Sequence, residues 1–385
     1  MNNNNEQKDY KIEWSKVLEA FQKVKANNGC PGADGISIAD IEKNPSEFLM
    51  PLWNKMLNGS YFPDYIRQVT IPKPNGSKRI LEIPTVTDRV AQQVIKYELE
   101  QIANSQFSPN SFGYRPNTST YMAVEQCRTN CNRYRWIIKI DIKNFFQSID
   151  HKLLMSFVRQ FIEKEHILIY LERWIQIPVQ LKNGSLKFNK GKGTPQGGVI
   201  SPLLSNIFLH FTFDVWFEKV FPENSFERYA DDLIIHCQEI NEAKHILKEV
   251  KKRLKEYKLE INKKKSKILF CPNNHEQYQQ FKSKYKEFEF LGFRFKSEMI
   301  TEVDKTEMTF ITVSNQKSKT KKKTLNKNKQ RSKLYPLLKM LRKTIKTKIY
   351  YKLIHFYHSI LWRLRNLFYM FRWMLRGCIR NFYHW

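Results

Sequence analysis

The chain has 385 residues and a formal net charge of +29, with 66 Lys and Arg against 37 Asp and Glu. Its hydrophobic content of 41% is ordinary for a folded protein and excludes a chain that is disordered throughout. The length allows two or three domains. So large a positive charge indicates a polyanionic partner, most often nucleic acid, with a membrane surface or a basic face kept for solubility as alternatives.

Six cysteines are scattered along the chain without a Cys-x-x-Cys pair. Cys127 and Cys131 are one helical turn apart, but no His or second Cys pair follows at zinc-site spacing, so we interpret the cysteines as free thiols. The first ten residues, MNNNNEQKDY, lack the apolar core of a signal peptide, and no run of 18 apolar residues predicts a membrane span. We therefore expect a cytoplasmic, prokaryotic protein in a reducing compartment, with no membrane partner.

The first part of the chain is predicted to be helical over about 60 residues, with a turn-rich loop at 27–37. Residues 66–83 then predict two strands joined by a Pro-Asn-Gly turn, because Asn and Gly tolerate positive φ. A helix capped by Asp88 is expected next, with an apolar stripe running from Val90 to Ile102.

The middle of the chain is richer in strands. WIIKIDI (136–142) is apolar and β-branched and predicts a strand, with Ile137, Lys139 and Asp141 on one face and Ile138, Ile140 and Ile142 on the other. Further predicted elements are a helix near 151–163, an Asn-Gly hairpin at 181–188, a helix capped by Ser201 with Pro202 in its first turn, a hairpin at 226–237, a charged helix at 241–257 and a last strand at 288–295. Helices and strands without regular alternation predict an α+β fold with an antiparallel sheet.

The charge changes abruptly near the C-terminus. No acidic residue follows Glu307, whereas residues 308–385 contain 20 Lys and Arg. We expect a domain boundary near 300–320, then a flexible basic loop at 315–333 and basic helices beyond it.

Three aspartates carry the chemistry that the sequence predicts. Asp231 and Asp232 are adjacent in an apolar hairpin, where burying two like charges is costly without a compensating cation. Asp141 ends a strand that an antiparallel sheet could place beside that hairpin. Clustered carboxylates on strands suit Mg²⁺. Two Mg²⁺ about 4 Å apart can activate the attacking oxygen and steady the leaving oxygen in displacement at phosphorus.

Seven stretches, in order, carry a resemblance to reverse transcriptases of the group II intron-like type. They are PGADGIS (31–37), RQVTIPKPNGSKRILEIPTVTDRVAQQVI (67–95), SFGYRPNTST (111–120), IKIDIKNFFQSIDH (138–151), GTPQGGVISPLLSNIFLH (193–210), RYADDLIIHC (228–237) and FLGF (290–293). The resemblance covers about residues 29–295. Diversity-generating and retron enzymes share a similar core. The Pro-Gln-Gly-Gly run and the Ser-Pro pair of the fifth stretch match the group II intron-like pattern.

This resemblance implies a right-hand polymerase with a ferredoxin-like antiparallel palm. The expected divisions are an N-terminal extension and fingers at 1–134, a palm at 135–298, and a basic loop and helical thumb at 299–385. The implied activity is RNA-directed DNA polymerisation, in which a primer 3′-OH attacks a dNTP, with two Mg²⁺ or substituting Mn²⁺. Asp141 and Asp231 are implied as direct metal ligands, while Asp232, one step along the strand, is assigned to the site with a different orientation.

The resemblance also implies contacts to the incoming dNTP. Phe146 is implied as the gate that rejects a 2′-OH, with a core aromatic as the alternative. The other implied dNTP residues are Arg67, Lys73, Arg79, Ile142, Gln196 and Gly197. Arg and Lys would grip the triphosphate, and Gly would allow close backbone approach. A solvated basic hairpin and an ordinary loop turn are the respective alternatives.

Template and primer contacts are implied for a further set, with packing or a strand bend as alternatives for the first four. They are Tyr114, Arg115, Tyr229, Gly292 and, in the basic tail, Lys321, Lys322, Lys323, Arg331, Lys339 and Arg342. The expected partners are an RNA template, a DNA or RNA primer and dNTPs, and a cognate structured RNA is a further candidate.

The sequence allows several biological roles. The tail lacks the Gly-Trp-x-x-Tyr-Tyr-like signature of intron maturases and any Cys/His nuclease pattern, so a free-standing enzyme in antiviral defence is one expectation. A maturase that acts mainly by binding RNA and a template-independent or protein-primed polymerase are the alternatives. The sequence does not determine the oligomeric state.

Overall fold

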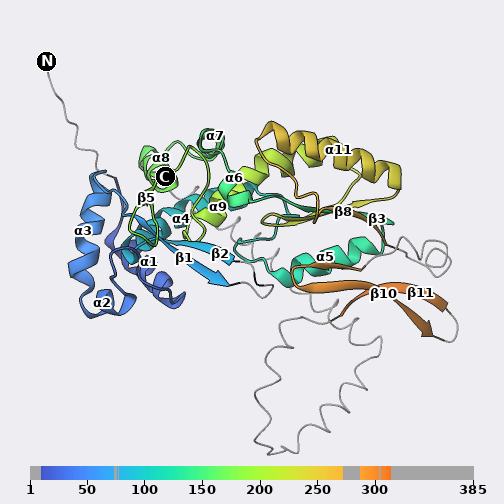
Figure 1. The fold of residues 1–385 in the computed structure, drawn as a ribbon, viewed down its shortest axis with the longest axis horizontal. Coiled ribbons are helices and arrows are strands. Elements are labelled where there is room, and N and C mark those ends of the chain that lie inside the picture. Colours follow the sequence, from blue (N-terminus) through green and yellow to red (C-terminus); the bar gives the residue numbers. More distant parts are fainter. Residues whose placement is uncertain (1–9, 73–75, 77, 272–286, 303–304, 314–385) are drawn as a thin grey trace, which may run out of the picture. The chain divides into compact units, whose positions relative to one another are not determined.

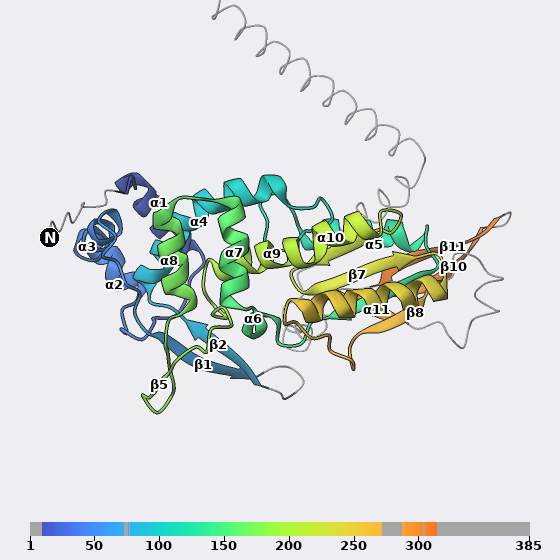
Figure 2. The ribbon, with the colours of Figure 1, turned by 90° about the horizontal axis from the view of Figure 1, so that it is seen from above.

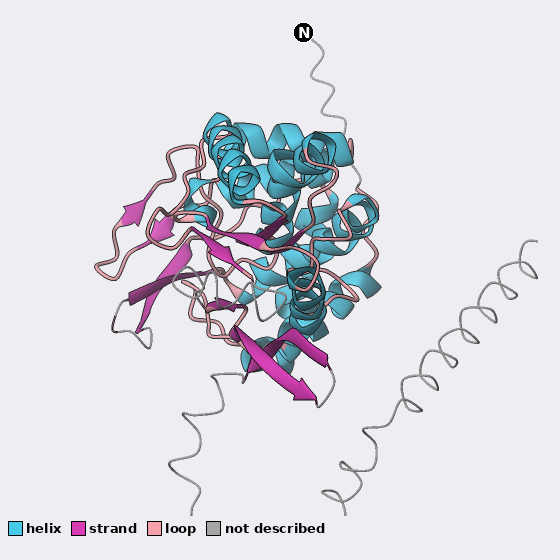
Figure 3. Cartoon of the chain, turned by 90° about the vertical axis from the view of Figure 1, so that its right-hand side faces the viewer, coloured by secondary structure: helices cyan, strands magenta, loops and turns pink. Residues whose placement is uncertain are grey.

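The computed structural model describes residues 10–72, 76, 78–271, 287–302 and 305–313, all within the first of two units of the chain, Met1–Gln316. Helices and antiparallel strands are segregated in these residues, which confirms the predicted α+β class (Figures 1 and 3). The predicted basic loop and thumb helices lie outside the described residues.

The palm is a four-stranded antiparallel sheet in the order β6-β7-β3-β8. Its strands are β3 (Trp136–Asp141), β6 (Phe226–Tyr229), β7 (Asp232–Cys237) and β8 (Lys267–Phe270). Helices separate β3 from β6, and α11 (Ile240–Glu256) separates β7 from β8. A β-α-β-β-α-β order with the first strand between the third and fourth is the ferredoxin-like topology, as predicted.

The two faces of this sheet are covered differently (Figures 1 and 2). On one face, Ile138, Ile140, Leu233 and Ile235 are buried in the core they share with α9 (Ser201–Leu209), the π-helical turn η1 (His210–Asp214), α10 (Val215–Val220) and α11. We call this the helix face. On the other, Ile137 and Ile234 join a smaller core with α5 (Thr120–Cys131) and β9 (Phe288–Phe290). This second face carries Asp141 and Asp232, and we call it the catalytic face.

The fingers region contains a second sheet in the order β2-β1-β4-β5. Its strands are β1 (Ile66–Pro72), β2 (Lys78–Ile83), β4 (Val179–Gln180) and β5 (Leu186–Lys187), so both predicted Asn-Gly hairpins are present. The helices preceding and following β1–β2 are α1 (Trp14–Ala26), α2 (Ile38–Lys43), α3 (Pro45–Leu57) and α4 (Val86–Gln106). These elements bring the fingers hairpin next to the palm.

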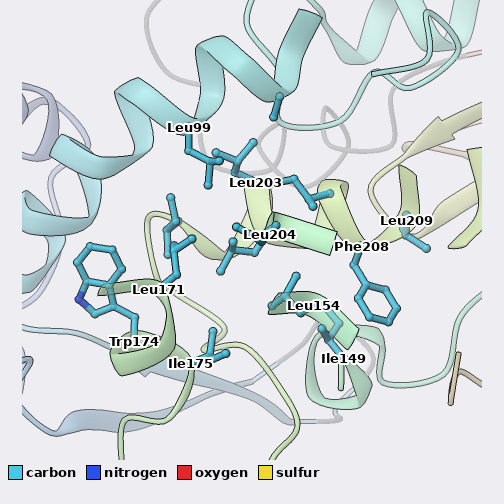
Figure 4. Packing of buried hydrophobic residues seen from close by; sticks show 14 of the residues in the cluster. Leu99, Ile149, Leu154, Leu171, Trp174, Ile175, Leu203, Leu204, Phe208 and Leu209 are labelled. Atoms are coloured by element: carbon cyan, nitrogen blue, oxygen red, sulfur yellow. The ribbon is translucent and has the colours of Figure 1, made fainter. Parts of the chain in front are cut away.

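A common core connects the fingers region with the palm (Figure 4). Leu99 of α4, Leu154 of α7 (His151–Phe161), Leu171 of α8 (Glu165–Ile175) and Leu203 of α9 are all fully buried in it. Burying each leucine contributes about 1.5–3 kcal/mol. The site therefore rests on helices that are fixed by packing.

Three local predictions are wrong. Thr85, and not Asp88, caps α4, since the amide of Asp88 donates to Thr85 Oγ1 at 3.1 Å. Ser201 is the first residue inside α9, and the cap position is Ile200. The segment 288–295 is two strands, β9 and β10 (Phe293–Glu302), because Leu291 and Gly292 both take positive φ and form a two-residue turn. A further strand, β11 (Lys305–Val313), pairs with β10.

Candidate active site

The three aspartates meet at one edge of the palm sheet. Asp141 is the last residue of β3 and pairs in register with Asp232, the first residue of β7. Residues directly opposite in an antiparallel pair project to the same face. Asp231 precedes β7 in the hairpin turn, after Ala230, whose φ is +55°. Asp232 therefore lies directly opposite Asp141 in the sheet, and the metal-ligand role implied for Asp231 stays a prediction.

Burial and nearby like charges raise the pKa values of two of these carboxylates. Burial raises the pKa of Asp231 to about 6, and the charges of Asp232 and Asp141 add to the effect. Burial also raises the pKa of Asp232, although the nearby ammonium of Lys139 opposes the shift. These carboxylates repel one another, and the neighbouring lysines offset that repulsion only in part. Such a set of hard oxygen donors is what a divalent cation such as Mg²⁺ prefers. The residues present thus fit the predicted metal.

The loop after α11 fixes the end of β3. The amide of Asp141 donates to Ser266 Oγ at 3.1 Å, and the amide of Asn262 donates to the Asp141 carbonyl at 2.8 Å. Lys265 Nζ lies 3.0 Å from Asp141 Oδ1 and is largely exposed. An exposed lysine can leave a carboxylate at little cost, because such pairs contribute about 0–1 kcal/mol.

A pocket of about 620 Å³ opens beside Asp141 and Asp232 on the catalytic face. Five basic and four acidic side chains contribute to its wall, which is lined by Lys139, Asp141, Asp232, Lys264, Lys265, Lys267, Leu269, Glu287, Phe288, Glu289 and Arg294. Cations beside carboxylates can hold phosphates next to a metal-binding edge. The pocket lies between the palm sheet and the strands β9 and β10, which contribute Phe288, Glu289 and Arg294.

The loop at 110–115 supports the backbone of the catalytic turn. The amide of Phe112 donates to the Arg228 carbonyl at 2.8 Å, and Asn206 Nδ2 donates to the Gly113 carbonyl at 2.6 Å. A Cβ at Gly113 would lie 2.4 Å from the Ala230 nitrogen, which is closer than atoms can approach. Gly113 is therefore required for the backbone of the catalytic turn to take its position.

Arg228 anchors the same turn on the helix face. Its Nε donates to Asp214 Oδ1 at 2.7 Å and its Nη1 to Asn206 Oδ1 at 2.9 Å, all three side chains being buried. A third donation reaches the carbonyl of Ala230 at 3.3 Å. The sequence did not reveal this network, because Asp214 and Asn206 lie in a helical run and nothing along the chain indicates that they meet Arg228.

The two predicted tyrosines lie next to the aspartates. The rings of Tyr114 and Tyr229 are 6.0 Å apart, and Tyr114 is half exposed. Burial raises the pKa of Tyr114, and the charge of Asp231 raises it further while Arg79 opposes the shift. Arg79 of the fingers hairpin is thus within electrostatic range of the site, as a triphosphate contact requires.

Arg115 has a different environment. Its guanidinium donates to Asn104 Oδ1 at 2.8 Å and to the carbonyls of Ser108 and Ser111 at 2.6 Å. These bonds favour the packing alternative over a template contact.

The other predicted dNTP residues with described positions lie in β1 and in the loop before α9. Arg67 Nη1 donates to the carbonyl of Pro31 at 3.4 Å, and Lys73 lies outside the described residues. Glu82 and Gln196 join β2 to the loop before α9, since the Glu82 amide donates to the Gln196 carbonyl at 2.9 Å. Gly197 has a φ of +143°, and a Cβ there would lie 2.5 Å from the Glu82 carbonyl oxygen. The close backbone contact that Gly197 allows is therefore with Glu82 of β2.

The predicted sugar gate lies directly after the catalytic strand. Phe146, in α6 (Phe145–Ser148), is half-buried, and its carbonyl accepts from the Thr194 amide at 2.8 Å. Its ring is 5.6 Å from that of Phe145. Ile142 is buried and bridged to Ile261, so only its backbone could reach a nucleotide. The six predicted tail contacts, from Lys321 to Arg342, lie outside the described residues.

A ferredoxin-like palm with three aspartates at one edge, next to a fingers hairpin, is the arrangement of a right-hand polymerase. The chain belongs to the reverse transcriptase family, because a family model described as reverse transcriptase (RNA-dependent DNA polymerase) matches residues 71–295.

Two curated relatives also align with part of this chain. Protein YkfC of Escherichia coli (strain K12) is 36% identical over 205 residues, which cover 51% of this chain and 53% of that protein. The group II intron-encoded protein LtrA of Lactococcus lactis subsp. cremoris is 31% identical over 244 residues, covering 60% of this chain and 39% of LtrA. The chain thus matches about half or less of the length of these relatives.

Among solved structures, apo telomerase from Candida tropicalis, truncated from its C-terminal domain, aligns with a TM-score of 0.46 and 16% identity, over 60% of this chain and 53% of that chain. None of the helices within the described residues is long and apolar enough to cross a membrane.

Proposed function

We propose that the chain is a group II intron-like, RNA-directed DNA polymerase whose catalytic residues are Asp141, Asp231 and Asp232. The observation that carries this proposal is the register pair of Asp141 with Asp232, adjoining Asp231, beside a pocket whose wall includes four lysines and one arginine. These carboxylates would hold two Mg²⁺, or Mn²⁺ in their place, which when bound supply charge stabilisation for the displacement at phosphorus.

The chain's other residues position the reactants. Arg79, with Lys73 and Arg67, would bind the triphosphate, and the loop with Gln196 and Gly197 would lie over the nucleotide. The pocket cations would hold the phosphates of the primer end, next to Tyr229 and the turn that contains Gly292. In this assignment residues 1–134 form the N-terminal extension and fingers, 135–298 the palm, and 299–385 the basic loop and thumb.

Primer extension on an RNA template tests the proposal directly. The purified full chain is compared with Asp231→Asn, Asp232→Asn and a matched control, Asp64→Asn, in which an exposed carboxylate away from the site is removed. We expect extension by the parent and the control and none by the two site variants. Equal extension by all four would refute the site assignment, and a parent that extends no primer would refute the polymerase assignment.

Sugar selection provides a finer prediction. Phe146→Val opens space next to the catalytic strand, so ribonucleotides are expected to be incorporated more readily relative to dNTPs. The control Phe188→Ala removes an aromatic side chain that is 66% exposed, and should leave the ratio unchanged. Competition between a dNTP and its ribonucleotide on one template measures the ratio. Unchanged selectivity in Phe146→Val would remove this residue as the gate.

A maturase that acts mainly by binding a structured RNA is the second candidate, because LtrA is an intron-encoded protein. Asp231→Asn separates the two functions, since RNA binding should survive the loss of a carboxylate. Sequencing of the extension products distinguishes copying from template-independent or protein-primed synthesis. An antiviral defence role predicts that the catalytic variant loses protection against phage in cells.

A further inference from the structure

The outer side of α11 carries a row of lysines. Ala243, Ile246, Val250 and Leu254 form the inner side of this helix and are buried in the core on the helix face of the palm. The outer side is exposed, and at 3.6 residues per turn its lysines fall within about 100° of the helix circumference. We call them the lysine row: Lys244, Lys248, Lys251, Lys252 and Lys255. The polymerase chemistry proposed above uses none of them.

The lysine row has no acidic partner within the part of the chain that the structure describes, where none of its members forms a salt bridge. Glu256 of the same helix lies 3.6 Å from Arg253 instead. Exposed lysines just beyond the helix are paired, as where Lys258 Nζ lies 2.6 Å from Asp150 Oδ2. The row therefore presents its positive charge to the surroundings of the palm.

The spacing of the row is unfavourable for the helix on its own. Lys244, Lys248 and Lys252 follow one another four residues apart, as do Lys251 and Lys255. Like charges at this spacing destabilise a helix. A helix kept only for solubility could alternate Glu with Lys at these positions and be stabilised by the pairs. A bound polyanion would turn the repulsion within the row into attraction, because its own charges would lie between the lysines.

The chemistry of the surface favours a phosphate backbone over other polyanions. A helix that binds a membrane surface inserts its apolar side, but the apolar side of α11 is buried. Protein interfaces are enriched in aromatic residues and Arg and depleted in Lys, whereas no Trp, Tyr, Phe or Arg is exposed on α11. Phosphates need only a line of point charges, which lysines supply. From Lys244 to Lys255 the row is about 16 Å long at 1.5 Å per residue, enough to follow one strand past several phosphates.

The row and the aspartates lie on opposite sides of the palm. α11 covers the helix face, whereas α5 and β10 lie on the catalytic face (Figure 1). Asp141 and Asp232 belong to the catalytic face. A primer–template duplex held there is separated from the row by the sheet and by α11 itself. The row is therefore suited to a second segment of nucleic acid.

We propose that the lysine row binds the phosphate backbone of double-stranded RNA, as a second RNA surface on the outside of the palm. The choice of RNA over DNA rests on the proposed function, because an enzyme that copies RNA meets folded RNA beside the stretch being copied. The surface itself needs no catalysis. Contacts to phosphates alone carry no sequence information, so the binding should be independent of sequence and steeply dependent on salt.

Acetylation of lysines in the full chain, read by mass spectrometry, tests the placement without any variant. The probe is a blunt RNA duplex of about 20 base pairs, long enough to present more than one turn of backbone. We expect the duplex to protect the row at low salt and to leave it reactive at high salt. Lys23 of α1 and Lys55 of α3 are exposed and should react equally in all conditions. A row that reacts at the same rate with and without the duplex would overturn the proposal.

Substitutions then measure the contribution of the row. The row variant combines Lys244→Gln, Lys248→Gln, Lys251→Gln and Lys255→Gln, and a second variant places Arg at the same positions. A scattered control removes equal charge from exposed lysines of α1, α3, α7 and α10, by Lys23→Gln, Lys55→Gln, Lys152→Gln and Lys219→Gln. All side chains concerned are exposed, and melting temperatures check that each variant folds.

Fluorescence anisotropy of the labelled duplex over a range of KCl gives the slope of log K against log salt. The slope of the row variant should be shallower than that of the parent by about 3, near 0.9 for each lost phosphate contact. The Arg variant and the scattered control should keep the slope of the parent. A row variant with the slope of the scattered control would overturn the proposal.

Two further probes separate RNA from other anions. A slope that falls for a DNA duplex of the same length but not for RNA would refute the choice of RNA. Loss of binding to vesicles containing phosphatidylserine, with the RNA slope unchanged, would assign the row to a membrane surface instead. Primer extension is scored separately. A parent that extends no primer while the row variant loses its slope would refute the polymerase alone, whereas normal extension with an unchanged slope would refute the lysine row alone.

Discussion

The two faces of the palm sheet treat buried polar groups in opposite ways. On the helix face, the guanidinium of Arg228 is paired with Asp214 and Asn206, so the chain itself satisfies its charge. On the catalytic face, burial raises the pKa of both Asp231 and Asp232, and the charge of Asp141 adds to both shifts. The Arg228 network holds the fold, whereas the carboxylates of the catalytic face are suited to a bound cation.

The strongest test of this contrast is a substitution on the catalytic face. Asp232→Asn is expected to lower the rate of primer extension by about 100-fold or more, since even groups that only orient metal ligands cost 10–100-fold. Its free energy of unfolding without Mg²⁺ should stay equal or rise, because a repulsive charge has been removed. Extension assays and urea denaturation measure both. A clear loss of stability would place Asp232 among the structural groups.

The converse is expected on the helix face. Asp214→Ala leaves the guanidinium of Arg228 buried without its carboxylate, which should lower the free energy of unfolding by about 3–5 kcal/mol. The double variant Asp214→Leu/Arg228→Met removes both charges and is expected to recover most of that loss. Urea denaturation of Asp214→Ala and of the double variant measures the loss and its recovery. A double variant no more stable than Asp214→Ala would show that the unpaired charge of Arg228 is not the main cause of the lost stability.

The approach of the 110–115 loop to the catalytic turn gives a smaller effect. Gly113→Ala places a Cβ against the backbone of Ala230 and should cost about 1–3 kcal/mol, with a loss of extension because Asp231 moves. Gly29→Ala is the matched control. Its Cβ would meet only the flexible end of Arg89, at 2.3 Å, so the side chain can move away. Equal effects of the two variants would contradict a specific role for Gly113.

Local pattern was enough to predict much of this architecture. Alternation along 136–142 correctly separated Ile138 and Ile140 from Lys139 and Asp141, and the Asn-Gly pairs located two hairpins. The aspartates were found because adjacent carboxylates in an apolar hairpin are too costly to keep without a bound cation. The pairing of Asp141 with Asp232 was not predicted, because it depends on the positive φ of Ala230 in the turn, which alanine does not signal.

Contacts between distant segments were missed for a different reason. The buried group of Cys127, Glu227 and His236 combines α5, β6 and β7, so rules based on spacing along the chain could not detect it. One signal was present: His236 has the same parity as Asp232 in one strand and so had to lie on the catalytic face. Gly113 was likewise hidden, since its partner Ala230 is remote in the sequence.

The smallest predicted effect compares two neighbours in β3 that point to opposite faces. Ile140→Val removes one methyl group from the fully buried helix face and should cost about 0.5–1.5 kcal/mol, with the rate of extension unchanged. Lys139→Met keeps the chain length but removes a pocket cation, so it should lower extension while stability stays nearly constant. Urea denaturation and extension at saturating dNTP measure both quantities. If the two variants lost stability and activity in the same proportion, the division of the sheet into a structural and a ligand-dependent face would be wrong.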